Sequence, residues 1–578
     1  MRRTYIFLLF SLCILIYSIF AILSINELAI GDASFYVVGS KIFNNRSLET
    51  SFNRFIFLAT SPLYGHLLAL IDRFFFLNHI TARVIGILSF VVTLILIYAI
   101  ILKISKDQEN RHFIGFLGIF LYSINPMVIQ GSLLTDIDTT ILVPFLLGFV
   151  YCFIVLNENN SKDKYFILGV IFAFNLWAKL TTPFALILTI FIFYFLNGKL
   201  REGIKASGSI FLSGLSLFII SLFIYCYFTK REFLAPFLHI KDSFYGTSPL
   251  LLSSSPTSIV LNIARILLRI ILFSTPFYFL IYILSSWERL REIVLRRKVQ
   301  YIDFLLILSF IILFAYLFVG GIAFSFPKYH YPFLSLAAII NAFFIGKKLK
   351  FDKSGLLLYA TIAIIIAAYN IFFVEDLLYL SDYALRESLI ITGKITNGLV
   401  KQILLNSLLY ILPFLIVLLI LKIMKYSALI YKAIFIWTVS ACFSLNILQA
   451  KADYHTIYCY GGRGTNEATL FLKRISKETD RILTTEDISR NIDEKRYLIN
   501  PHYWLLNNYC LDPEEFISFI ADKRPECIVF SISSNTVQQY RRVFLNPKVI
   551  SFLEKNFIKK TIGSYTIWLR NKYSNFKK

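Results

Sequence analysis

Residues 1–36, which read MRRTYIFLLFSLCILIYSIFAILSINELAIGDASFY, decide the fold of this chain. Two arginines precede an apolar run over residues 5–23, and about twenty apolar residues are enough to cross a bilayer. The run has no clear small-x-small cleavage pattern, so we expect an uncleaved anchor and not a signal peptide. An acidic residue, Asp32, follows shortly after the run, where it would lie at the membrane surface.

The whole chain has the composition of a membrane protein. Of its 578 residues, 57% are hydrophobic and only 16% are charged, against about 25% charged in soluble proteins. The formal net charge of +23 would suggest nucleic acid in a soluble protein, but the basic residues collect in short loops, so we expect no nucleic-acid partner. Apolar runs of membrane length number about thirteen, with cores at 5–25, 84–102, 113–129, 139–156, 165–180, 182–197, 208–228, 262–284, 303–323, 332–346, 355–374, 404–422 and 429–448.

Basic residues alternate between the predicted loops and set the orientation. If the N-terminus lies in the cytoplasm, the inside loops are rich in Lys and Arg, as at 103–111, 199–205 and 289–298. The outside loops are longer yet poorer in these residues, and 125–138 contains none. The positive-inside rule therefore predicts a multi-pass plasma-membrane protein with a cytoplasmic N-terminus. Because the number of spans is odd, the C-terminal tail would lie outside.

The composition divides the chain into a transmembrane domain over 1–450 and a soluble extracytoplasmic domain over 451–578. We expect the fold to be mainly α: a polytopic helical bundle followed by a small α/β domain. The first outer loop, 26–83, contains two amphipathic stretches, around 35–43 and 63–76, that suit helices lying in the membrane interface. In the soluble domain we expect strands at 481–485, 527–531 and 564–569 and a helix at 513–523.

Three acids on the predicted outer face are candidates for chemistry. A positioned carboxylate such as Asp32 can act as a general base, although a helix cap or a solvated loop acid is the alternative. Asp136 and Asp138 lie two residues apart before the span at 139–156 and could bind a divalent cation or orient a polar substrate. The alternative for this pair is N-capping of that span. A divalent metal held by Asp32 and Asp138 stays open.

Several cations are expected on the same face. Lys179 lies at the outer end of a span, where a lysine either snorkels to the surface or meets an anion. Arg265 and Arg269 are one helical turn apart, and Lys328 precedes Tyr329 in a short loop. Cations above acids on one membrane face suggest a phosphorylated lipid head group as the ligand.

Familiar soluble-enzyme motifs are missing from the sequence. There is no P-loop, no Gly-x-Gly-x-x-Gly motif, no His-Glu-x-x-His motif and no Gly-x-Ser-x-Gly motif. The seven cysteines show neither metal-ligand spacing nor a disulfide framework. A Walker-type ATP site and a cytosolic nucleotide-sugar site are therefore not expected.

Short motifs along the chain resemble the C-type integral-membrane glycosyltransferases, and more narrowly the protein O-mannosyltransferase and aminoarabinose-transferase group. The segments that carry the resemblance are Gly31-Asp32-Ala33-Ser34-Phe35-Tyr36, Ser61-Pro62-Leu63-Tyr64, Ala82-Arg83, Asp138 with Asp136 as the second choice, Trp177-Ala178-Lys179, and Lys328-Tyr329-His330-Tyr331-Pro332. The tail, with its Ile-Val-Phe strand, also looks like the outer domain of many members. The resemblance runs over nearly the whole chain.

The resemblance implies a transferase that moves a sugar, a hexose or a pentose, from a polyprenyl-phosphate carrier to a lipid, glycan or protein acceptor at the outer face. It implies Asp32 as the base that deprotonates the acceptor hydroxyl, with inversion at the anomeric carbon. A positioned carboxylate can do this, since the phosphate is already a competent leaving group. The residues expected to bind substrate are Arg83, Asp136, Asp138, Lys179, Arg265, Arg269, Lys328 and Tyr329.

A transporter or flippase for a lipid-linked glycan is the alternative function. Transporters usually contain paired, interrupted helices in two similar halves, with polar residues near mid-membrane. This chain is expected to keep its acids and cations at the outer ends of spans and to add an outer domain, which favours an enzyme. A receptor or scaffold function would leave the placement of Asp32, Asp138 and Lys179 at the outer ends of spans unexplained.

Overall fold

A computed structural model describes most of the chain. Asp32, Arg265 and Arg269 and the amphipathic stretch around 35–43 lie outside the described residues, so the expectations that rest on them stay predictions. Apart from a few isolated positions, the described residues are 3–24, 62–75, 79–159, 163–229, 270–296, 299–319, 327–349, 356–378, 397–451, 464–477, 479–484, 498–499, 513–531 and 546–570.

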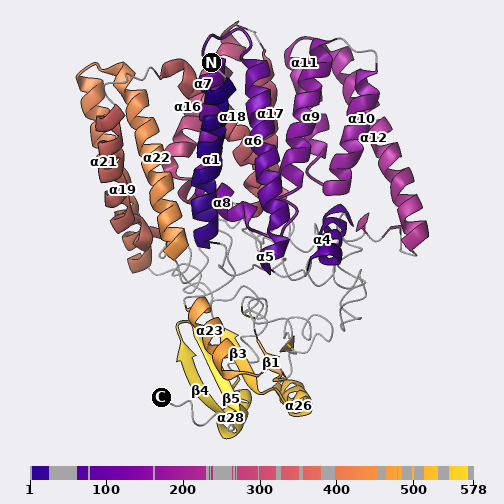
Figure 1. The fold of residues 1–578 in the computed structure, drawn as a ribbon, viewed down its shortest axis with the longest axis vertical. Coiled ribbons are helices and arrows are strands. Elements are labelled where there is room, and N and C mark those ends of the chain that lie inside the picture. Colours follow the sequence, from indigo (N-terminus) through magenta and orange to yellow (C-terminus); the bar gives the residue numbers. More distant parts are fainter. Residues whose placement is uncertain are drawn as a thin grey trace. The chain divides into compact units, whose positions relative to one another are not determined.

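The described residues form two compact units. The first holds those up to 371 together with 412–447, and the second holds the rest. The first unit is helical, and its long helices run side by side (Figure 1). Helices along the chain are α1 Arg3–Ser24, α4 Pro62–Phe74, α5 His79–Ala82, α6 Val84–Ile104, α7 Arg111–Ser123, α8 Pro126–Ser132, α9 Leu142–Glu158, α10 Lys164–Ala178, α11 Phe184–Leu196, α12 Leu200–Thr229, α16 Pro276–Arg296, α17 Tyr301–Val319, the 3-10 helix η2 Pro327–His330, α18 Tyr331–Lys348, α19 Leu356–Leu378, α21 Asn397–Ile423 and α22 Ser427–Lys451.

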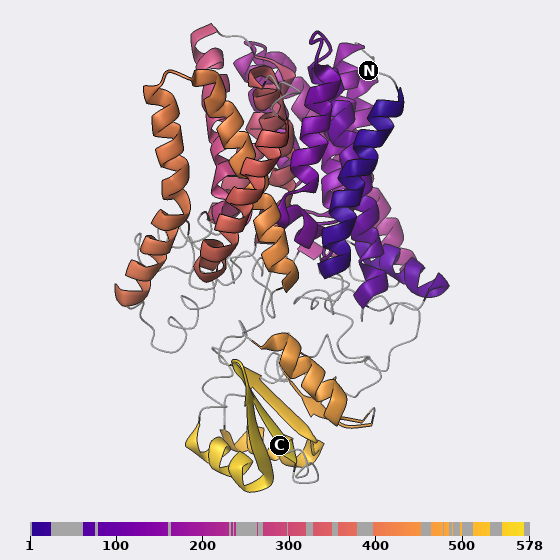
Figure 2. The same ribbon diagram turned by 60° about the vertical axis from the view of Figure 1, so that its left-hand side comes forward.

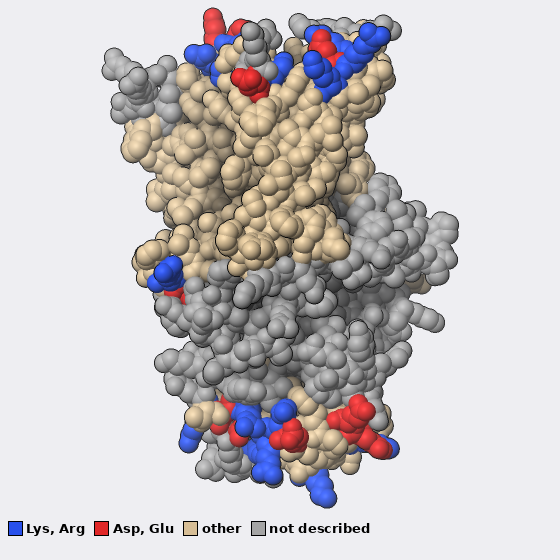
Figure 3. Space-filling model, turned by 90° about the vertical axis from the view of Figure 1, so that its right-hand side faces the viewer, with Lys and Arg blue, Asp and Glu red and all other residues tan. Residues whose placement is uncertain are grey.

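The helical unit has the surface of a membrane protein. Figure 3 shows a broad band without Lys, Arg, Asp or Glu over the helices, while charged side chains gather at the end where the N-terminal ends of α10 and α12 lie. Within the described part of the chain, six helices are long and apolar enough to span a bilayer, or seven if the bent pair α7–α8 is one span. Several shorter apolar helices accompany them. The multi-pass architecture is as expected, and the count of about thirteen spans stays a prediction.

One predicted span, 113–129, is broken between α7 and α8, whose axes differ by 66°. Pro126 lacks an N–H and disfavours a helical conformation in the residue before it. Asn125 is accordingly extended, and its side chain caps α8 by accepting a hydrogen bond from the N–H two residues on. The side chain of Asn446 donates to the carbonyl of Ile124 at 2.8 Å, so the break leaves that carbonyl satisfied. The bend leads into the turn that carries the two acids.

The predicted span at 262–284 is also interrupted. Helical residues continue to Phe273, and α16 begins only at Pro276. Between them Thr275 has a φ of 68°, a left-handed conformation that a β-branched residue rarely adopts. Its hydroxyl accepts a hydrogen bond from the N–H of Tyr278 at 3.2 Å, which caps the start of α16. The helix then extends beyond the predicted end to Arg296.

The second unit contains a five-stranded sheet with the order β2-β1-β3-β5-β4. β1 pairs in parallel with β2 and β3, whereas β5 is antiparallel to β3 and β4. The predicted helix at 513–523 and the strand at 527–531 are present as expected. The elements are α23 Thr465–Ile475, β1 Ile482–Leu483, β2 Leu498–Ile499, α26 Pro513–Lys523, β3 Cys527–Ser531, α28 Pro547–Asn556, β4 Phe557–Ile562 and β5 Tyr565–Arg570.

Both faces of this sheet are covered by helices, as Figure 2 shows. Successive residues of β3 point to opposite faces: Ile528 and Phe530 pack in the cluster that includes residues of α26 and α28, and Cys527 and Val529 in the cluster that includes α23. A strand buried on both faces reads as a continuous apolar run, which is why 527–531 was recognisable in the sequence. The region therefore has an α/β architecture with two small cores.

Candidate functional site

A buried turn between α8 and α9 carries the two acids predicted from the sequence. One side-chain oxygen of Asp136 accepts a hydrogen bond from the backbone N–H of Asp138 at 2.9 Å. The backbone carbonyl of Asp136 accepts from the hydroxyl of Thr140 at 2.5 Å. This is the local closure that a short acidic side chain gives a turn. Asp136 and Asp138 are 2% and 4% exposed, so each charge needs a partner.

Two lysines from distant parts of the chain supply those partners. Lys179 follows α10 in an extended conformation and pairs with Asp138. Lys328 lies in η2, just before α18, and its Nζ donates to Asp136 Oδ2 at 2.7 Å. Three separate elements of the helical unit therefore meet at this site. The structure brings these two acids and two lysines together, and each pair is in direct contact.

Tyr329 joins the two ion pairs. Its ring centroid lies 4.9 Å from the ammonium nitrogen of Lys179 and 5.2 Å from that of Lys328. An ammonium group close to an aromatic ring is attracted by the ring's quadrupole, most strongly where water is excluded. We refer to Asp136, Asp138, Lys179, Lys328 and Tyr329 as the acid–lysine cluster.

The charges of the acid–lysine cluster balance. Two carboxylates and two ammonium groups leave no formal excess, which is the condition under which buried charges are tolerated. Because each pair joins a turn to a different element, the cluster fixes the relative positions of α9, α10 and α18. The acid–lysine cluster can therefore keep its charged groups in a fixed geometry at one end of the apolar bundle.

Arg83 lies near the same end of the bundle and belongs to the structure around the end of α1. Its guanidinium donates to the backbone carbonyl of Ser24 at 3.4 Å, and Gln130 of α8 donates to the Ser24 hydroxyl at 3.0 Å. About two turns earlier in α1, the hydroxyl groups of Tyr17 and Ser132 form a hydrogen bond of 2.8 Å. The last turns of α1 are therefore fixed against α8, the helix that leads into the acidic turn. Sequence reasoning identified Arg83 but missed Ser24 and Gln130, because uncharged polar residues near a span give no distinctive signal.

Close packing brings α6 against the end of α8. A Cβ placed on Gly86 would lie 1.8 Å from the backbone oxygen of Ser132. No side chain fits there without moving the backbone, so glycine is required at this contact. The contact places the last residue of α8, just before the acidic turn, directly against the first turn of α6.

No metal site is visible in the part of the chain that the structure describes. Within those residues there is no group of three or more His, Cys, Asp or Glu side chains placed to hold an ion. Asp136 Oδ2 and Asp138 Oδ1 each face a lysine, and Asp136 Oδ1 accepts from the backbone N–H of Asp138. Asp32, the other residue that the sequence analysis considered for a metal, lies outside the described residues.

Comparisons with known proteins bear on the fold and on one stretch of sequence. A model of the family described as dolichyl-phosphate-mannose-protein mannosyltransferase matches residues 59–225. No curated protein matches the chain. Among solved structures, ArnT from Cupriavidus metallidurans bound to undecaprenyl phosphate is 11% identical, with a TM-score of 0.56 and 98% of each chain covered. The same protein in the apo state is 10% identical, with a TM-score of 0.53, covering 98% of this chain and 97% of that one.

At these identities the structural likeness establishes the fold, and the family match adds an independent sequence signal that includes Arg83, Asp136, Asp138 and Lys179. Both findings point to the group that the motifs suggested. The resemblance drawn from the sequence is confirmed: the chain is similar to the C-type integral-membrane glycosyltransferases, in fold over nearly its whole length and in sequence over residues 59–225.

Proposed function

We propose that the protein is a membrane glycosyltransferase that transfers a sugar from a polyprenyl-phosphate carrier to a lipid, glycan or protein hydroxyl at the outer face of the membrane. The observation that carries the proposal is the acid–lysine cluster, a buried and charge-balanced group at the end of an apolar bundle with the ArnT fold. That ArnT was crystallised with undecaprenyl phosphate, which supports a carrier of this chemical class.

In this proposal the lysines act on the leaving group. When the glycosidic bond breaks, negative charge grows on the carrier phosphate, and preorganised cations lower the energy of that charge. Lys179 and Lys328 are held in place by Asp138 and Asp136, so they need little reorganisation when a phosphate arrives. Arg265 and Arg269 are further candidates for the same phosphate. Tyr329, between the two lysines, would contact the carrier or the sugar.

Asp32 is the proposed general base. It follows the end of α1 by eight residues, and that end is fixed beside α8 through Ser24. A chain segment extends by at most about 3.6 Å per residue, so Asp32 is tethered within about 29 Å of Ser24. Deprotonation of the acceptor hydroxyl by Asp32 would allow in-line attack at the anomeric carbon, with inversion and departure of the carrier phosphate.

The orientation belongs to the same proposal. The acid–lysine cluster would face the outside of the cell, with the N-terminus in the cytoplasm and residues 451–578 as an outer domain. The lysine- and arginine-rich loops at the opposite ends of the helices support this orientation through the positive-inside rule.

A transfer assay with the full-length protein in lipid nanodiscs tests the function. Undecaprenyl-phosphate-linked hexoses and pentoses serve as donors, a membrane extract from cells lacking the protein supplies acceptors, and mass spectrometry identifies the product. We expect transfer by the natural protein and a loss of about a hundredfold or more in Asp32→Asn. Asp163→Asn, at an exposed position before α10, is the matched control and should transfer normally.

Two outcomes would contradict the proposal. Normal transfer by Asp32→Asn would remove the base assignment while leaving the transferase intact. Movement of intact labelled carrier across proteoliposome membranes, without any transfer product, would instead support the flippase.

A further inference from the structure

A polar cavity lies at the other ends of two helices, α9 and α10, that flank the acid–lysine cluster. It has a volume of about 320 Å³. Asn157 in the last turn of α9 and Lys164 at the start of α10 line it, whereas Asp138 and Lys179 lie beyond the opposite ends of the same two helices. At 1.5 Å per residue, helices of this length separate the two regions by about 20 Å. The cavity is therefore distinct from the proposed transfer site.

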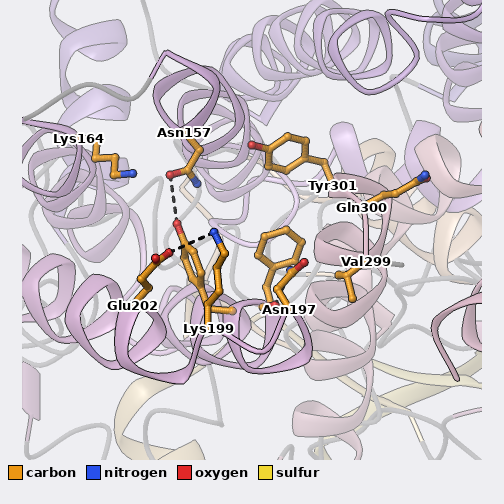
Figure 4. Close-up of a pocket in the computed structure, with 10 residues that line it drawn as sticks. Asn157, Lys164, Asn197, Lys199, Glu202, Val299, Gln300 and Tyr301 are labelled. Atoms are coloured by element: carbon orange, nitrogen blue, oxygen red, sulfur yellow. Dashed lines mark hydrogen bonds and ion pairs between the residues drawn. The ribbon is translucent and has the colours of Figure 1, made fainter. Parts of the chain in front are cut away.

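Three helices begin at this cavity. Lys164 is the first residue of α10, Lys199 immediately precedes α12, and Tyr301 is the first residue of α17; all three line the cavity (Figure 4). Helix N-termini carry partial positive charge and free N–H groups, which favour anions and disfavour lysines. Two lysines at such positions are unfavourable for helix stability, and an anionic ligand between them would offset that cost.

The cavity wall contains a cation without a carboxylate partner. Among the described residues Lys164 makes no ion pair, and its ammonium group contacts the ring of Tyr165 at 5.2 Å. In Figure 4 its side chain points inward, as do those of Asn157 and Lys199. Lys199 pairs with Glu202 at 3.7 Å, a long and exposed contact that contributes little energy. Lys199 can therefore turn from Glu202 to a ligand with little loss of free energy.

The other wall residues are held in place by hydrogen bonds to neighbouring protein groups. Tyr194 donates to the side-chain oxygen of Asn157 at 3.2 Å, which leaves the amide N–H groups of Asn157 for a ligand. The start of α17 is fixed by Asp303, which accepts from the backbone N–H of Gln300 at 2.7 Å and pairs with Arg289. Such preorganised walls lose little entropy when a ligand binds.

We propose that this cavity binds a phosphate group borne on a polyol, either the head group of an anionic phospholipid or a soluble polyol phosphate. The two lysines and the N-termini of α10 and α12 match the phosphate. The amide of Asn197 and the carboxylate of Glu202 match hydroxyl groups beside it. The cavity opens among helix ends at the face that the positive-inside rule assigns to the cytoplasm, where anionic lipid head groups are concentrated.

Two binding measurements on the full-length protein separate the two sources. In the lipid arm, native mass spectrometry counts phosphatidylglycerol molecules retained from nanodiscs of phosphatidylglycerol and phosphatidylcholine. In the soluble arm, calorimetry in a neutral detergent measures binding of glycerol 3-phosphate. We expect Lys164→Gln to weaken binding about fivefold, as loss of one lysine–phosphate contact would. Lys205→Gln, an exposed lysine of α12 that does not line the cavity, should have no effect.

Phosphatidylglycerol retention without binding of glycerol 3-phosphate identifies a lipid as the ligand. Binding of glycerol 3-phosphate without lipid retention identifies a soluble ligand. Either result supports the site. Equal losses in Lys164→Gln and Lys205→Gln would show general attraction to basic loops and would overturn it. So would the absence of any phosphate ligand in both arms. Because Lys164 lies far from the acid–lysine cluster, transfer activity in nanodiscs of phosphatidylcholine should be unchanged in Lys164→Gln, which separates this test from that of the proposed function.

Discussion

Lys328 and Asp136 are 192 residues apart in the chain and form an ion pair of 2.7 Å. Both side chains are almost fully buried, at 5% and 3% exposed. Removal of one partner from such a pair strands the other charge in an apolar environment, whereas removal of both does not. This relationship makes the acid–lysine cluster open to direct experiment.

We expect Lys328→Met to lower the free energy of unfolding by about 3–5 kcal/mol, because Asp136 would stay charged and buried. The double variant Asp136→Asn/Lys328→Met should regain most of that stability, since neither member of the pair is then charged. Thermal unfolding of the purified protein in one detergent measures both changes. A double variant as unstable as Lys328→Met would show that the lysine acts through packing and not through its charge.

Gly86→Ala should disrupt the contact between α6 and α8. The added carbon would meet the backbone oxygen of Ser132 at 1.8 Å, so a helix must shift. Gly148→Ala in α9 is the matched control, because nothing lies within 4 Å of its added carbon and alanine favours helix by about 1 kcal/mol. We expect a lower melting temperature only in Gly86→Ala. An unchanged melting temperature in both variants would contradict the close approach.

Arg289 and Asp303 form a second buried pair, between α16 and α17. Arg289 donates two hydrogen bonds to Asp303, at 2.8 and 2.7 Å, and Asp303 is fully buried. Arg289→Met should destabilise the protein by about 3–5 kcal/mol, and Arg289→Met/Asp303→Leu much less. Arg291→Met, two residues along the same helix and exposed, serves as the control in the same thermal assay.

Reporter fusions test the orientation that the proposed function needs. A periplasmic-type reporter fused after residue 460 should be active, and one fused after residue 205 should be inactive, since the basic loops favour the cytoplasm. Cytosolic reporters at the same two positions should give the opposite result. An inactive external reporter at 460 would overturn the predicted orientation and the placement of the acid–lysine cluster on the outer face.

The sequence predicted much of the candidate site because charges are rare in an apolar chain. Asp136, Asp138, Lys179 and Lys328 each lie at the end of an apolar run, and a consistent topology places all four on one face. Which acid pairs with which lysine could not be predicted, because it depends on how three elements pack. The position of Tyr329 between the lysines depends on the same packing.

Other features were missed for physical reasons that can be named. Arg289 looked like a topology signal because a basic residue near a span end usually is one, and its pairing with Asp303 requires two helices to meet. The breaks at Asn125 and Thr275 fall within apolar runs, and hydropathy does not register backbone direction. Pro126 was visible in the sequence and does indicate the first break.

The two side-chain oxygens of Asp136 have partners that are synthesised at different times. One oxygen closes a turn with Asp138, which is available as soon as that segment is made, whereas the other waits for Lys328. Lys179, the partner of Asp138, is synthesised 41 residues after its acid. The Asp138–Lys179 pair can therefore form earlier in synthesis than the Asp136–Lys328 pair. The ion pair between Asp136 and Lys328 therefore forms only after η2, in the second half of the chain, has been made.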